Sequence, residues 1–554
     1  MNKTTMNIPT FRKYLALILF SITIYGCSST KETAKDSHSQ ARDSVDFANV
    51  VTPPEDWHHL DRKENMYPGI STHKVYREIL KKKKPSKKVI MAVIDSGIDP
   101  EHEDLASVIW TNEDEVPGNR KDDDNNGYVD DVNGWNFIGG PDGENVDHDT
   151  FELTRIYARL NDQFSDADTT QLAEKELEKY RYYQQIKSDY GDKVVELVQQ
   201  YDNIESLAGS IKQGRRILDQ YFGKDDYEYV DIKNLEADSR ELQFAQQVMM
   251  YAMDNDIDSA VIANEKKRIY ENAKFRYNPD FDPRPIVQDD YSDKQECCYG
   301  NNDIKGPDAR HGTHVAGIIA AVRDNEIGMN GVSSNTEIMP VRAVPDGDER
   351  DKDVANAIRY AVDNGADIIN MSFGKGYSPY KDVVDEAVRY AEEHDVLLVH
   401  GAGNESSDSD VNPKYPTRFY EEYLNEPSNQ LWLSIGATSW NPEDGFVANF
   451  SNFGQQAVHL FAPGSDIYST IPDSSYERLS GTSMASPVVA GTAALIMAYY
   501  PELSAAQVKD ILIESTIKYS NKQVQLPGRS PNEETEEVEF GKLSQSGGVV
   551  NVYE

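Results

Sequence analysis

Residues 88–99 read KVIMAVIDSGID, an apolar run that ends at a carboxylate and a glycine. After Lys88 the run is continuous and rich in β-branched residues, which is typical of a strand buried on both faces of a parallel sheet. Apolar runs at 337–341, 367–371, 396–399 and 433–437 repeat this pattern, and helical patterns such as DVANAIRYAVDNG and VVDEAVRYAEEH lie between them. Strands that alternate with helices predict an α/β fold, a parallel sheet sandwiched by helices.

The end of the first strand is a candidate functional position. In open α/β sheets ligands bind outside the carboxyl ends of the strands, and Asp95 lies at such an end. Two further stretches carry reactive side chains: RHGTHVAG contains His311, and SGTSMASP contains Ser483, just before a long apolar run. Serine is a weak nucleophile that needs a base, and that base is usually a histidine held by a carboxylate. Asp95, His311 and Ser483 are therefore the candidate catalytic residues.

The order of these residues along the chain narrows the choice of enzyme family. Asp95 precedes His311, which precedes Ser483, and this order excludes the α/β-hydrolases and the chymotrypsin-like barrels. Three motifs, AVIDSGID, HGTHVAG and GTSMASP, together with HGAGN at 400–404, resemble those of the subtilases, the subtilisin-like serine peptidases. The resemblance covers about residues 65–150 and 300–554.

The resemblance implies a role for each matching residue. Ser483 would attack the scissile carbonyl, His311 would carry its proton, and Asp95 would orient His311. Asn404 matches the family's oxyanion-hole asparagine, and no cofactor is implied for catalysis. The segments that flank the specificity pocket, where an extended peptide or protein substrate would pair, match Ser372, Phe373, Gly374, Gly401, Ala402 and Gly403. The alternative for these small residues is close packing between strands. His314 lacks the neighbouring glutamate of zinc peptidases and is predicted to be a packed core residue.

A second candidate site is the acidic stretch DDDNNGYVDD at 122–131. Its oxygen ligands follow the spacing of an EF-hand-like loop, with a glycine at the sixth position and asparagine in place of the bidentate glutamate at the twelfth. Many subtilases carry calcium-binding loops, so a structural calcium ion is expected; the alternative is a solvated acidic turn. The predicted ligands are Asp122, Asp124, Asn126, Tyr128 through its carbonyl, and Asp130.

The N-terminal region indicates export and anchoring. Residues 1–26 combine basic residues with a short apolar stretch, as in a signal peptide, and IYGC at 24–27 resembles a bacterial lipobox. We therefore expect lipidation at Cys27, a polar tether over 27–64, and a location on the membrane of the bacterial cell envelope. No other segment is expected to span a membrane.

The charge and the cysteines limit other functions. The chain has 554 residues and a formal net charge of -39, so a face that attracts nucleic acid is not expected. Its three cysteines cannot build a disulfide framework. Cys297 and Cys298 are adjacent, and the sequence leaves open whether they form a vicinal disulfide or remain two thiols.

The segment 151–289 interrupts the peptidase domain, which comprises 65–150 and 290–554. Its apolar residues follow helical spacing near 194–211 and 242–252, which predicts a helical insertion rather than a coiled-coil arm. This insertion is interpreted as a lid, a platform for a docking partner, or an elaboration without its own function. The rival hypothesis for the whole chain is a catalytically silent envelope scaffold whose insertion binds a partner. A weaker rival is an acyl transferase that uses the same acyl-enzyme.

Overall fold

The computed structural model describes residues 45, 47, 50–420, 429–443, 445–528 and 536–554. The expected signal peptide and Cys27 lie outside these residues, so both stay predictions. Most of the expected tether lies outside them as well.

The centre of the described fold is a nine-stranded sheet in the order β10-β13-β7-β6-β5-β4-β1-β3-β2. Every neighbouring pair runs parallel except β10 and β13. This confirms the predicted α/β fold with a mostly parallel sheet. The strands are β1 (Val89–Asp95), β2 (Trp135–Asn136), β3 (Thr336–Arg342), β4 (Ile368–Met371), β5 (Leu397–Gly401), β6 (Trp432–Thr438), β7 (Leu460–Pro463), β10 (Ile517–Lys518) and β13 (Gly548–Val549).

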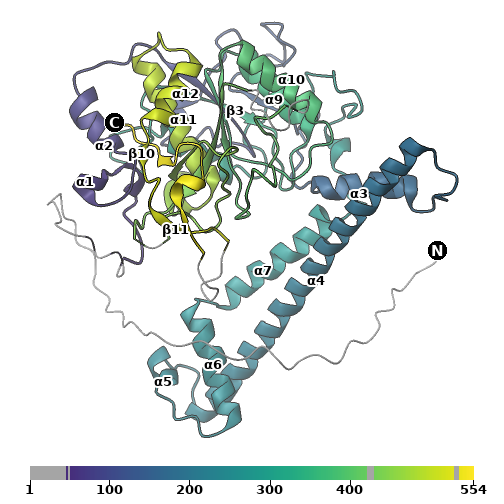
Figure 1. The fold of residues 1–554 in the computed structure, drawn as a ribbon, viewed down its shortest axis with the longest axis vertical. Helices are drawn as coiled ribbons and strands as arrows, with labels where there is room; N and C mark the ends of the chain where they lie inside the picture. Colours follow the sequence, from purple (N-terminus) through teal and green to yellow (C-terminus); the bar gives the residue numbers. More distant parts are fainter. Residues whose placement is uncertain (1–44, 46, 48–49, 421–428, 444, 529–535) are drawn as a thin grey trace. The chain divides into compact units, whose positions relative to one another are not determined.

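The two faces of the sheet are covered by different helices, as Figure 1 shows around β3. Along β1, Val89, Met91 and Val93 pack into a core with α8, α11 and α12, while Ala92 and Ile94 pack into another with α9 and α10. Alternate side chains of a strand point to opposite faces, so burial on both sides explains the unbroken apolar run. The covering helices are α8 (Arg310–Ala320), α9 (Asp351–Asp363), α10 (Lys381–Glu393), α11 (Thr482–Tyr499) and α12 (Ala505–Glu514).

Between β2 and α8 the chain forms a group of helices. They are α3 (Glu152–Phe164), α4 (Glu174–Phe222), α5 (Tyr229–Lys233), α6 (Arg240–Asp254) and α7 (Ser259–Glu271). The 49-residue α4 runs beside α6 and α7 (Figure 1), and it also packs against α3. The helical spacing at 194–211 therefore belongs to the middle of one long helix. We use "the insertion" for these five helices.

The packed part of the chain begins earlier than the sequence indicates. Phe47 and Trp57 are buried in the main core, and the Trp57 indole nitrogen donates to the Asp466 carbonyl oxygen at 3.3 Å. The short helices α1 (Arg62–Asn65) and α2 (Thr72–Val75) follow. The boundary expected at residue 64 between tether and domain is therefore too late, because two aromatic residues in a polar stretch suffice to dock it.

Three smaller features complete the described fold. The hairpins β8 (Ile467–Ile471) with β9 (Ser475–Leu479) and β11 (Gln523–Gln525) with β12 (Glu537–Glu539) lie outside the main sheet. Cys297 and Cys298 are joined as a vicinal disulfide. Contrary to the expectation that no further segment is apolar enough to span a membrane, α11 is long and apolar enough to do so, but 83% of it is buried inside the protein, as in a core helix.

Candidate active site

Asp95 and His311 meet at the carboxyl end of β1. The His311 Nδ1 atom donates to the Asp95 Oδ1 atom at 2.7 Å, and the same oxygen accepts the Ser96 backbone N–H at 2.8 Å. Asp95 is buried, and its Oδ2 atom has no hydrogen-bond partner among the described residues. Because 216 residues separate the two side chains in sequence, this contact exists only in the folded chain.

The glycine after His311 makes this contact possible. His311 lies in the first turn of α8, and a Cβ on Gly312 would collide with the Gly97 carbonyl oxygen and lie 3.1 Å from the Asp95 Cβ. Only glycine allows the helix backbone to approach the turn after β1 so closely. The HGTH sequence therefore sets the position of His311 as well as its identity.

The environment of His311 favours its charged form. Burial alone would lower the pKa of His311, but the charge of Asp95 and the hydrogen bond to it outweigh burial, so that the pKa is raised above its usual value. The His311 side chain is still 39% exposed, which leaves the far side of the imidazole accessible. An imidazole held in this way can accept a proton and share the resulting charge with a fixed carboxylate.

Ser483 lies at the start of α11, beside the end of β4. Its hydroxyl donates to the Ser372 carbonyl oxygen at 3.0 Å, and the Ser372 hydroxyl in turn hydrogen-bonds the Ser483 carbonyl oxygen at 3.0 Å. Within the described chain, Ser483 is thus bonded to Ser372 and not to His311. Catalytic hydrogen bonds often form only when substrate binds, so this geometry does not exclude a Ser483–His311 pair.

Two hydrogen-bond donors converge next to Ser483. The Asn404 Oδ1 atom accepts the Thr482 backbone N–H at 2.8 Å and the Thr482 hydroxyl at 3.1 Å, which orients the side-chain amide. A Cβ on Gly481 would lie 3.5 Å from both the Asn404 Nδ2 atom and the Ser483 backbone nitrogen. These two nitrogens therefore lie close to the same point beside Gly481, and a role for Asn404 in an oxyanion hole stays a prediction.

The six residues predicted to bind substrate lie directly after β4 and at the end of β5. A cavity of about 240 Å³ is lined by Asp95, His311, Ser372 and Phe373. Gly401 packs against Thr482, whose carbonyl oxygen would lie 3.2 Å from an added Cβ. Packing thus accounts for one of the glycines. A role in substrate binding remains a prediction for Ser372, Phe373, Gly374, Gly401, Ala402 and Gly403.

The other polar residues near these motifs are structural. His314 is buried, its Nε2 atom lies 3.0 and 3.1 Å from two carbonyl oxygens, and burial lowers its pKa to about 3. His314 is therefore the packed core residue that was predicted. Ser486 hydrogen-bonds the Ser372 hydroxyl at 2.9 Å, and the Ser480 hydroxyl accepts the Asp466 backbone N–H at 2.9 Å.

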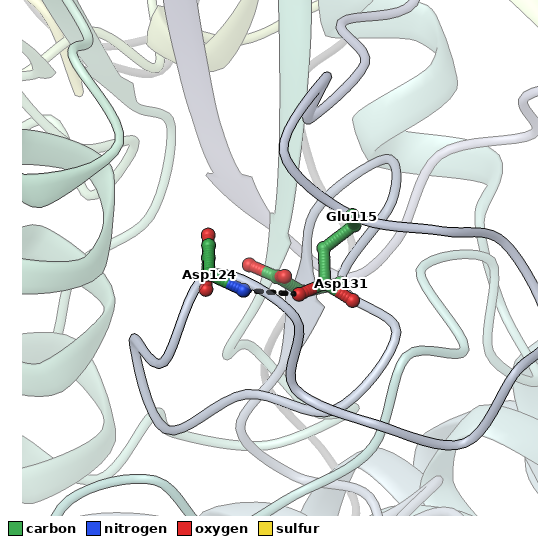
Figure 2. A group of neighbouring side chains, drawn as sticks. All are labelled: Glu115, Asp124 and Asp131. Atoms are coloured by element: carbon green, nitrogen blue, oxygen red, sulfur yellow. Dashed lines mark hydrogen bonds between the residues drawn. The ribbon is translucent and has the colours of Figure 1, made fainter.

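A separate carboxylate cluster is formed by Glu115, Asp124 and Asp131 (Figure 2), which offer one oxygen each within 4.8 Å of one another. Asp131 is fully buried and Glu115 is 5% exposed. Burial and the Asp124 charge raise the pKa of Asp131. The Glu115 Oε2 atom has no hydrogen-bond partner in the described part of the chain. Three oxygens in such a group match the ligands that Ca²⁺ prefers.

This cluster differs from the predicted ligand set of Asp122, Asp124, Asn126, Tyr128 and Asp130. The Asp122 carboxylate accepts the backbone N–H groups of Asn126 and Gly127 at 3.1 and 2.9 Å. Asp130 likewise accepts two backbone N–H groups, at 3.1 and 2.7 Å. These two carboxylates hold the turns of the loop, and Asp124 alone among the predicted carboxylates joins the cluster.

The two missed members had weak signals in the sequence. Asp131 directly follows a predicted ligand, but the EF-hand spacing selects its neighbour. Glu115 precedes the loop by several residues and follows no spacing rule.

The chain is similar in sequence to proteins of one known family. The model of the Subtilase family matches residues 86–542. Subtilisin DY of Bacillus licheniformis is 38% identical over 206 residues, which are 36% of this chain and 68% of that protein. The cell wall-associated protease of Bacillus subtilis (strain 168) is 38% identical over 38% of this chain and 22% of that protein. The thermophilic serine proteinase of Bacillus sp. (strain AK1) is 38% identical over 40% of this chain and 48% of that protein. The chain thus spans about two thirds of the first relative, but half or less of the other two.

Proposed function

This chain belongs to the subtilase family of serine endopeptidases, and on that premise we propose that Asp95, His311 and Ser483 hydrolyse peptide bonds through an acyl-enzyme. The observation that carries the proposal is the 2.7 Å hydrogen bond between His311 and Asp95, which line one cavity with Ser372, the hydrogen-bond partner of Ser483. The N-terminus of α11 favours developing negative charge at Ser483. No observation on the described residues favours the silent scaffold.

The proposed reaction starts when the Ser483 hydroxyl leaves the Ser372 carbonyl oxygen and turns to His311. The serine oxygen forms a bond to the substrate carbonyl carbon while its proton passes to the His311 Nε2 atom. The negative oxygen of the tetrahedral intermediate takes hydrogen bonds from the Asn404 amide and the Ser483 backbone N–H. The carbon–nitrogen bond then breaks, and His311 gives its proton to the leaving amine. Water repeats these steps on the acyl-enzyme and restores the Ser483 hydroxyl.

A fluorophosphonate probe tests this proposal directly. The protein without residues 1–27 is treated with the probe beside the Ser483→Ala variant, and labelling is read by mass spectrometry. We expect one label on the first protein, at Ser483, and none on the variant. Absence of labelling on a folded protein, with and without Ca²⁺, would contradict an activated Ser483.

We further propose that lipid at Cys27 tethers the peptidase to the membrane of the bacterial cell envelope. The support is the sequence around the cysteine, a basic and apolar leader that ends in IYGC and precedes a polar stretch. Two or more acyl chains suffice for stable anchoring. The test measures how the full chain and the Cys27→Ala variant partition between a detergent phase and an aqueous phase. We expect the full chain in the detergent phase and the variant in the aqueous phase; the same partition of both would argue against lipidation.

A structural calcium ion is the third proposal, with Glu115, Asp124 and Asp131 as ligands in place of the set expected from the loop. The Glu115 Oε1 atom accepts the backbone N–H groups of Asp123 and Asp124, whereas the buried Oε2 atom has no partner among the described residues. This supports the proposal, because a buried charged oxygen without a partner is costly unless a cation compensates it. Thermal unfolding is measured with Ca²⁺ and with chelator. At 100-fold excess over Kd, Ca²⁺ should add about 2.7 kcal/mol to the free energy of unfolding.

Two matched variants separate the two ligand sets. Asp131→Asn should abolish the response to Ca²⁺, whereas Asp122→Asn should retain it. If the stabilisation by Ca²⁺ is lost in Asp122→Asn and kept in Asp131→Asn, the ligands are those expected from the loop. No response in the unchanged protein would exclude both.

A further inference from the structure

A cavity of about 540 Å³ lies between the insertion and the peptidase domain. One wall is Tyr182, which α4 contributes from inside the insertion. The other walls include Gly376 and Tyr377 from the segment after β4, and Lys414 with Tyr415 from the loop after β5. The cavity is therefore shared between the insertion and the peptidase domain.

This cavity adjoins the residues around Ser483. Ser372, whose carbonyl oxygen accepts the Ser483 hydroxyl, lies four residues before Gly376. Lys375, which lies between these two residues, pairs with Tyr415 through two backbone hydrogen bonds of 3.0 and 2.9 Å. On the other side, Glu405 lines the cavity and directly follows Asn404. The two segments that contact the start of α11 through Ser372 and Asn404 thus continue into the wall of the cavity, which is the observation that links the cavity to a peptide bound at Ser483.

The base of the insertion is fastened to the same segment. The Lys375 ammonium, 2% exposed, lies 3.0 Å from the carboxylate of Glu152 on α3. The Tyr377 hydroxyl donates to the Asp189 carboxylate of α4 at 3.0 Å, and the Tyr377 ring packs against the apolar cluster between α3 and α4. The buried ion pair holds α3, and the Tyr377 hydrogen bond and ring hold the adjoining part of α4. It is a fixed wall and not a lid.

The chemistry of the cavity favours a large apolar side chain. Tyr182, Tyr377 and Tyr415 line it together with Val411 and two prolines. The two charged groups in its lining are already matched, because the Lys414 ammonium lies 2.9 Å from one Glu405 oxygen. The other Glu405 oxygen accepts the Asn452 amide at 2.8 Å. These two charges are therefore matched to each other, and the three tyrosine rings of the lining can stack on another aromatic ring.

We propose that Tyr182 is a specificity-determining residue, and that with Tyr377 and Tyr415 it binds an aromatic side chain of the peptide substrate. The proposal rests on the peptidase function proposed above. It assigns the base of the insertion a role in substrate selection. Tyr182 is 44% exposed, so its ring has a free face to offer.

The test is a set of fluorogenic peptides in which each position around the scissile bond is either phenylalanine or glycine. The measured quantity is the ratio of kcat/KM for phenylalanine over glycine at each position. We expect Tyr182→Ala to lower this ratio about 5- to 10-fold at one position, mainly through KM, because one ring contact is lost. Tyr182→Phe keeps the ring and should keep the ratio. Tyr201→Ala, which removes an exposed tyrosine further along α4, is the matched control.

Three results would overturn the proposal. They are an unchanged ratio at every position in Tyr182→Ala, an equal loss of kcat/KM at all positions, and the same change in Tyr201→Ala. The affinities of the same peptides, measured by fluorescence anisotropy in the Ser483→Ala background, repeat the comparison without turnover. If no peptide is cleaved and no fluorophosphonate label appears, the peptidase function fails, and the affinity ratios still decide whether Tyr182 selects aromatic side chains.

Discussion

Replacement of Asn404 by alanine should impair both catalysis and stability, with the larger free-energy cost in catalysis. The variant loses the amide N–H that faces the space next to Ser483, and loss of one such donor costs about 10²–10³ in kcat, or about 2.7–4 kcal/mol. It also loses the acceptor for the Thr482 backbone N–H and hydroxyl, bonds of 2.8 and 3.1 Å. At about 0.5–1.5 kcal/mol each, these bonds contribute about 1–3 kcal/mol to the free energy of unfolding.

The control for this prediction is Thr482→Val, which keeps the Asn404 amide. It removes one of the two bonds that orient the amide and also the acceptor of the Gly403 backbone N–H. We expect its kcat to fall less than about tenfold. Both variants are assayed for acylation by a chromogenic peptide under single-turnover conditions, and for stability by urea unfolding. A kcat within about threefold of the unchanged protein in folded Asn404→Ala would refute the oxyanion assignment. Equal losses in both variants would mean that Asn404 acts only by holding the start of α11.

Three further predictions concern the surroundings of the site. The kcat/KM of the unchanged protein should rise with pH through an apparent pKa above about 6.5, because the His311 base must be neutral and its pKa is raised. Asp95→Asn should move this rise to lower pH and should lower kcat about 10⁴-fold. A rise that stays at the same pH in the variant would contradict the argument. Gly312→Ala should lose about 1–3 kcal/mol of stability in urea unfolding through its collision with Gly97, and a loss below about 0.5 kcal/mol would show that α8 can shift freely. Lys375→Met leaves the buried Asp351 carboxylate without its charged partner and Glu152 with Arg155 alone, and should cost about 3–5 kcal/mol. An unchanged calorimetric midpoint would disprove this.

The fold and the catalytic candidates were predictable because their signals are local. An apolar run without alternation indicates a strand covered on both faces, and five such runs became β1, β3, β4, β5 and β6. The motifs around Asp95 and His311 combine a reactive side chain with the glycine that its backbone needs. Gly312 shows the reason, since the close approach to Gly97 permits no side chain at that position.

The cation ligands were only partly predictable. The EF-hand spacing counts positions along one loop and assumes that its carboxylates point inward together. In the folded chain Asp122 and Asp130 bind backbone N–H groups of the loop, and their carboxylates lie outside the cluster. Glu115 and Asp131 reach the cluster instead, and no spacing rule selects them.

The sequence alone determined the class of fold, the family and the residues that are candidates for chemistry, because these depend on residue type and short-range spacing. Tertiary structure decided which distant side chains meet. It brought His311 to Asp95 across 216 residues, turned the Ser483 hydroxyl to Ser372, and set Tyr182 of the insertion opposite Tyr415. Such contacts arise from how separate elements pack, and each packing partner lies too far along the chain for any local pattern to identify it.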